Sequence, residues 1–149
     1  MTDGGWNPWR SLRARPHIDF TIDPIAERGG GALHGRLGER SAIVISPELD
    51  RIERSAALAH ELVHDERGIG RPGATPATMQ VEERVVRRET ARRLVPLDAL
   101  LTFVDARVTV EPVTVALVAE EFEVPHAVAE EALRQLQVQL LERELHRRT

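Results

Sequence analysis

The 149-residue sequence predicts an α+β fold, in which a small N-terminal antiparallel β-sheet packs on helices. Short stretches that alternate apolar and polar residues come first, and stretches with apolar residues three and four apart follow. Segments rich in Gly and Pro separate these stretches. Strands followed by helices are typical of the α+β class rather than of repeated strand–helix units.

The first strand follows a segment without a clear pattern. Residues 1–16 are rich in Gly, Pro and Arg, and we expect a loosely ordered N-terminal segment that Trp6 and Trp9 anchor. Residues 17–22 (HIDFTI) alternate apolar and polar side chains, which predicts a half-buried strand.

A hairpin and a helix are expected next. Residues 32–37 and 41–45 flank a Gly-Glu-Arg turn, which predicts two paired strands. The first of these is a candidate sheet edge that an extended peptide could pair with, and an ordinary hairpin is the alternative. Residues 51–66 have helical spacing, with Ser46 or Asp50 as the candidate N-cap.

The rest of the chain is predicted to be helical. A Gly/Pro loop at 68–77 precedes it, and prolines divide the later helices. We expect these helices at residues 78–94, 97–104, 112–122 and 125–146. The core domain is therefore predicted at 17–105, with a helical extension packed on it at 106–149.

Composition limits the possible functions. The net charge is −4, which argues against broad nucleic-acid binding. The sequence has no apolar run of membrane-spanning length, and its start lacks the apolar region of a secretory signal, so we expect a cytoplasmic protein. Cys is absent, which excludes disulfides and thiolate metal sites. A bound metal must therefore use His, Asp or Glu.

Residues 60–64 read His-Glu-Leu-Val-His within a predicted helix. Side chains four apart lie on one helical face, so His60 and His64 can reach one metal ion. Glu61 is rotated about 100° from His60, so its carboxylate can face a water molecule in the fourth position and act as general base. The pattern predicts metal-assisted hydrolysis, and a surface helix with two histidines is the alternative reading.

Catalytic zinc usually has three protein ligands. The next predicted helix offers Glu82, Glu83 and Glu89. On a helical wheel, Glu83 shares a mainly apolar stripe with Val86 and Thr90, whereas the other two acidic residues share a polar face. A carboxylate on an apolar stripe needs a metal or a charged partner, which favours Glu83 as third ligand. An ion pair between Glu83 and Arg87 is the alternative.

Residues 53–64 (ERSAALAHELVH) resemble the active-site helix of ImmA/IrrE-type metallopeptidases. That family carries a Glu that opens a second helix, and this helix ends in a Leu-apolar-Pro step. Glu83 and the Leu-Val-Pro sequence at 94–96 are similar. The hairpin at 33–45 also looks similar, and the resemblance covers about residues 30–105.

Three positions depart from the family pattern. Glu89-Thr90 stands where Phe-Ala is frequent, Val86 stands where a small Ala is usual, and Asp65 stands where an apolar residue is more frequent. None of these differences removes a ligand, but they leave substrate choice and catalytic rate open.

The resemblance implies an intracellular, zinc-dependent endopeptidase with His60, His64 and Glu83 as ligands and Glu61 as general base. The family's substrates include helix-turn-helix transcriptional repressors, so the expected partner is such a repressor from the same phage or mobile-element locus. The alternative is a non-catalytic module on the same scaffold that binds a repressor or a toxin. Residue types suit zinc, although manganese and iron also remain open.

The C-terminal extension resembles a helix-turn-helix, with a turn at Val124-Pro125. Its second helix begins with His126 and early glutamates rather than with side chains that read base edges, so we expect a packing or docking module and no direct nucleic-acid binding. The other histidines stand singly, and we interpret them as surface or hydrogen-bonding residues: His17, His34, His126 and His146. Tyr is absent, so the donor to a developing oxyanion is not identified.

Overall fold

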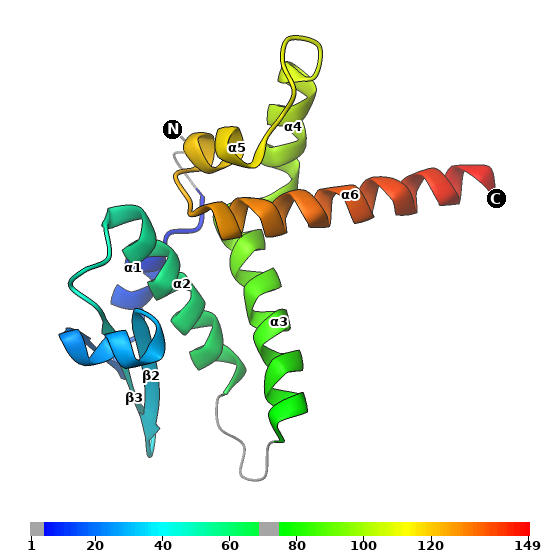
Figure 1. The fold of residues 1–149 in the computed structure, drawn as a ribbon. Helices are drawn as coiled ribbons and strands as arrows, with labels where there is room; N and C mark the ends of the chain where they lie inside the picture. The colour runs from blue at the N-terminus through cyan, green and yellow to red at the C-terminus, as the bar shows by residue number, and fades with distance from the viewer. Residues whose placement is uncertain (1–4, 69–74) are drawn as a thin grey trace. The chain divides into compact units, whose positions relative to one another are not determined.

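The computed structural model describes residues 5–68 and 75–149 and has the predicted α+β class (Figure 1). The chain forms two compact units that divide after Thr90, and each is described by itself. In chain order the elements are α1 (Pro8–Arg13), β1 (Ile18–Ile22), the 3₁₀ helix η1 (Pro24–Gly29), β2 (Ala32–Leu37), β3 (Arg40–Ile45), α2 (Arg51–Arg67), α3 (Pro76–Leu94), α4 (Leu97–Arg107), α5 (Val115–Phe122) and α6 (His126–Arg148).

The sheet has three strands in the order β1-β3-β2 and is mixed rather than antiparallel. β2 pairs antiparallel to β3 through the predicted hairpin, whose loop begins at Gly38 with a positive φ of 62°. β1, however, pairs parallel to β3. The antiparallel expectation was wrong for this pair, because the chain passes through η1 and β2 before β3 returns alongside β1 in the same direction.

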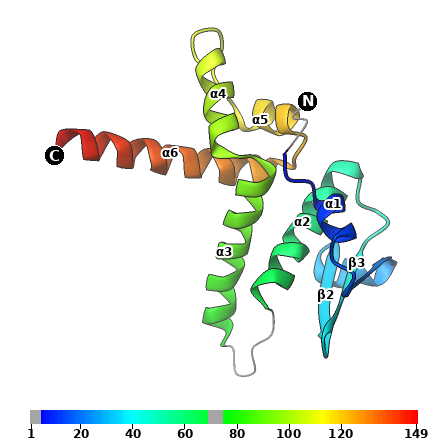
Figure 2. The same cartoon turned by 180° about the vertical axis from the view of Figure 1, so that it is seen from behind.

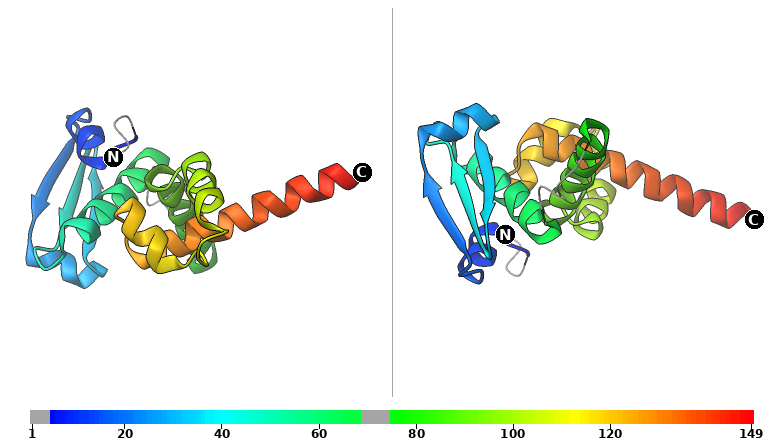
Figure 3. Two further views of the ribbon diagram at one scale, coloured as in Figure 1. Left: turned by 90° about the horizontal axis from the view of Figure 1, so that it is seen from above. Right: turned by 90° about the horizontal axis from the view of Figure 1, so that it is seen from below.

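One face of the sheet is covered by α2 (Figures 2 and 3). The period of two along β3 directs Ile43 and Ile45 to this face, where they are fully buried together with Leu58 and Leu62 of α2. Asp50 is the N-cap of α2: its side chain accepts from the backbone N–H of Glu53 in a capping box. The sheet thus fixes the helix that carries the His-Glu-x-x-His motif.

The N-terminal segment contains a helix that its sequence pattern did not suggest. Asn7 caps α1 by accepting a hydrogen bond from Arg10, and Pro8 stands in the first turn, where its missing N–H costs nothing. The indole of Trp9 donates to Ser55 Oγ at 3.1 Å and packs edge-on against Phe20. Tertiary contacts of one aromatic side chain therefore order a short segment that has no apolar period.

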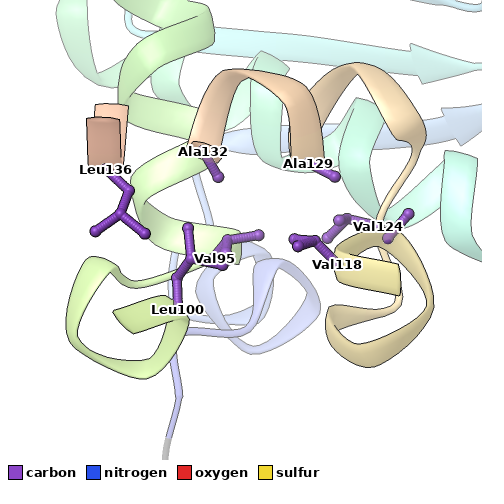
Figure 4. Packing of buried hydrophobic residues seen from close by; sticks show 8 residues of the cluster. Val95, Leu100, Val118, Val124, Ala129, Ala132 and Leu136 are labelled. Atoms are coloured by element: carbon purple, nitrogen blue, oxygen red, sulfur yellow. The ribbon is translucent and has the colours of Figure 1, made fainter. Parts of the chain in front are cut away.

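The second unit is a helical cluster around buried apolar residues, and Figure 4 shows this packing. Helix α6 packs against both α4 and α5. The buried members of the cluster are Val95, Leu100, Val118, Ala119, Val124, Ala129, Ala132 and Leu136. Leu100 of α4 belongs to this core, and the boundary between the two compact units follows Thr90, within α3. Among the described helices, none is long and apolar enough to cross a membrane.

Candidate metal centre

Helix α2 places His60 and His64 one turn apart on the same face. Their ring centroids are 4.8 Å apart, and the ring planes are inclined by 75°. Both imidazoles are only partly exposed. This is the side-by-side arrangement that the spacing of four predicts for a helix.

Glu83 of α3 brings a carboxylate to both rings. Its Oε1 lies 2.9 Å from His60 Nε2, and its Oε2 lies 3.0 Å from His64 Nε2. One ligand atom from each of the three residues lies within 4.8 Å of the others. His60, His64 and Glu83 could therefore hold a metal ion. The search that finds this group covers the described residues.

The alternative partner of Glu83 is more distant. Arg87 Nε lies 3.7 Å from Glu83 Oε1, and the Arg87 side chain is 67% exposed. Glu82 pairs with Arg67 of α2 and lies outside the group. The two imidazoles are therefore the closest partners of Glu83, as a shared metal site requires, and Arg87 adds a weaker contact at the surface.

Glu61 is buried, with 9% of its surface exposed. Burial, reinforced by the negative charge of Glu83, raises the pKa of Glu61 to about 7. Burial also lowers the pKa of His60, although the neighbouring Glu83 carboxylate opposes this. A neutral imidazole is the form that binds a metal, and a carboxylate with a pKa near neutrality is suited to proton transfer.

A second polar cluster lies between α2 and the sheet. Asp65 accepts hydrogen bonds from Ser41 Oγ, from His17 Nε2 at 2.8 Å and from His34 Nε2 at 3.1 Å. Burial raises the pKa of Asp65, but the hydrogen bonds from Ser41, His17 and His34 outweigh it and lower that pKa to about 2. The Asp65 carboxylate is thus ionised, and both of its oxygens accept hydrogen bonds.

The sequence predicts that His17 and His34 are single surface or hydrogen-bonding residues, and it does not indicate that they meet at one carboxylate. The available signal was the Asp directly after the His-Glu-x-x-His motif. The other two single histidines lie on α6, where His146 Nδ1 contacts the backbone oxygen of Glu142.

Comparison with known proteins adds no relative. No protein-family model, curated protein or solved structure matches this chain.

Proposed function

We propose that this protein is a zinc-dependent endopeptidase that hydrolyses a peptide bond in a partner protein. The observation that supports this most directly is the convergence of two imidazoles and one carboxylate from α2 and α3. Two nitrogens and one oxygen from His and Glu are a ligand set that suits catalytic zinc and leaves a position for water. Zinc bound there would supply Lewis acidity, which lowers the pKa of water and polarises a carbonyl group.

Glu61 is the proposed general base. It is the residue after His60, its side chain is buried, and its pKa is raised to about 7 by burial and by Glu83. A base of that pKa can accept a proton from water at neutral pH and return it to the leaving amine. His60, His64 and Glu83 have the different role of holding the metal.

β2 supports the choice of a peptide as substrate. It is an edge strand of the three-stranded sheet, and it contacts the motif helix α2. No strand of the described residues pairs with its outer side. An extended peptide can form main-chain hydrogen bonds with such an edge without demanding a particular sequence.

The proposed substrate is a helix-turn-helix repressor encoded at the same phage or mobile-element locus, and the proposed compartment is the cytoplasm. Both follow from the resemblance of residues 53–64 and Glu83 to ImmA/IrrE-type peptidases. A non-catalytic module that binds a repressor or toxin is the second candidate. A binding module of this kind requires the fold and a contact surface, but it does not require a buried general base.

The test uses the full chain loaded with zinc, incubated with the neighbouring repressor and with a randomised quenched-fluorescence peptide library. We expect cleavage by the natural protein, and at least a 100-fold loss of rate with Glu61→Gln while zinc is retained. Glu66→Gln, on the same helix but exposed, is the matched control and should cleave normally. Absence of cleavage by the zinc-loaded protein, or full activity in Glu61→Gln, would contradict the peptidase proposal.

A further inference from the structure

Asp65 joins one turn of α2 to all three strands. His17 stands directly before β1, His34 lies in β2, and Ser41 lies in β3, and each donates a hydrogen bond to the Asp65 carboxylate. The His34 side chain is 2% exposed and that of Asp65 is 5% exposed. Charge-assisted hydrogen bonds in such a buried setting are stronger and more directional than apolar contacts.

The register of the sheet explains how the donors converge. The backbone N–H of Ser41 donates to the His17 carbonyl at 2.9 Å, which places these two residues side by side. His34 pairs across the hairpin with Ile43, whose side chain is buried on the face that α2 covers. Alternation along β3 puts Ser41 on the same face as Ile43. The three donors therefore approach α2 from one surface.

The residue directly before Asp65, His64, is a candidate metal ligand. His64 Nε2 contacts Glu83 on α3, whereas Asp65 contacts the sheet. The hydrogen bond from His34 ties β2 directly to α2, and the hydrogen bonds from His17 and Ser41 tie the other two strands to the same carboxylate. Apolar contacts are not directional, so an apolar residue at position 65 would restrict sliding of the helix along the sheet less.

We propose that Asp65 is a positioning residue, which holds β2 in a fixed place relative to the metal centre. This inference depends on the proposed function, because β2 is the strand on which a peptide substrate would lie. Misplacement of reacting groups by about 1 Å costs about 100-fold in rate. The ligands themselves come from α2 and α3 and none from the sheet, so loosening the sheet should lower kcat while zinc affinity stays unchanged.

The experiment measures geometry and activity separately. The 16.7 kDa chain is loaded with cobalt(II), and the paramagnetic shifts of backbone amides in β2 and α3 are recorded by NMR for the natural protein and for Asp65→Asn. Asn has the same shape as Asp but presents an amide to one of the imidazole donors. We expect the β2 shifts to change and those of α3 to persist, together with about a tenfold or greater fall in kcat and an unchanged zinc Kd.

Two further variants separate positioning from simple loss of stability. The His17 side chain is 41% exposed, so His17→Ala creates little cavity and should fold. His17→Gln restores an N–H near the position of Nε2, and it should recover the β2 shifts and kcat that His17→Ala reduces. Asp19→Asn is the matched control, because Asp19 is an exposed carboxylate of β1 paired with Arg40 outside the network.

The outcomes are distinguishable. Cobalt shifts in the natural protein combined with unchanged β2 shifts and kcat in Asp65→Asn and His17→Ala would overturn the positioning role and leave the peptidase proposal intact. No cobalt shifts in the natural protein would overturn the metal centre and the positioning role together. All measurements are made well below the unfolding midpoint of each variant, where a purely structural role leaves kcat and the shifts unchanged.

Discussion

His64 and Asp65 are neighbours on α2, yet their side chains contact different layers of the structure. His64 Nε2 lies 3.0 Å from Glu83 of α3, and Asp65 Oδ2 lies 2.8 Å from His17 at the start of the sheet. Successive residues of a helix are about 100° apart, which allows this divergence. A single helical turn thereby contacts both Glu83 on α3 and the start of the sheet.

Glu83 and Arg87 provide a test of the metal centre. Glu83→Gln should lower zinc affinity by at least about 100-fold, because it removes the only anionic ligand of the group. Arg87→Gln should change it less than about threefold, because Arg87 is exposed and contacts Glu83 at 3.7 Å. Competition with a chromophoric chelator measures both. Equal effects of the two substitutions would indicate that Glu83 serves the ion pair instead.

The raised pKa of Glu61 predicts a pH-dependent cost in the metal-free protein. Below the unfolded pKa of about 4.5 this carboxyl is protonated in both states and contributes nothing. Between that value and the folded value of about 7, the unfolded state ionises while the buried Glu61 stays protonated. The folded state therefore loses stability as pH rises through this range, by about 3 kcal/mol in all, and the loss is complete above pH 7.

Glu61→Gln should therefore be more stable than the natural protein at pH 8 and equal to it near pH 4. Urea titrations in the presence of a chelator, repeated across this range, measure the difference. A constant difference between Glu61→Gln and the natural protein would show that Glu61 is not desolvated as described.

Zinc should stabilise the fold through the same three ligands. A metal that binds only the folded state adds about 2.7 kcal/mol at a concentration of 100 Kd, which for a chain of this size raises Tm by about 5–10 °C. A chelator should reverse the increase. His60→Ala or His64→Ala should remove it, whereas His146→Ala, an exposed position on α6, should retain it. Thermal unfolding followed by circular dichroism makes these comparisons.

The local features of the site could be predicted from the sequence, but the contacts between its elements could be predicted only in part. Spacing alone placed His60 and His64 on one helical face, since that relation depends on helical geometry and on no other element. The helical wheel favours Glu83, and the structure brings Glu83 together with His60 and His64. Val86 and Thr90, which the wheel places on the same apolar stripe, are buried.

The features that sequence reasoning missed depend on contacts between distant elements. The parallel pairing of β1 with β3 follows from the order in which strands join the sheet, which alternation of side chains does not specify. The convergence of His17, His34 and Ser41 on Asp65 requires that register as well as the position of α2 on the sheet. Single histidines have no local pattern that reveals such partners.

The turn between α5 and α6 predicts a stabilising substitution. Glu123 follows α5 with φ 51° and ψ 54°. Among the described residues it is the non-glycine residue with a positive φ. A side chain in this left-handed region is strained, whereas Gly adopts it readily and is the residue most common at this place. Glu123→Gly should therefore raise the free energy of unfolding by about 0.5–1 kcal/mol.

The same change three residues earlier should have the opposite sign. Glu120 is an exposed position inside α5, where Gly costs about 1 kcal/mol through lost helix propensity. Chemical denaturation of the two variants under identical conditions compares them directly. Destabilisation by both would mean that the side-chain contacts of Glu123 outweigh its backbone strain, because the left-handed geometry alone favours glycine there.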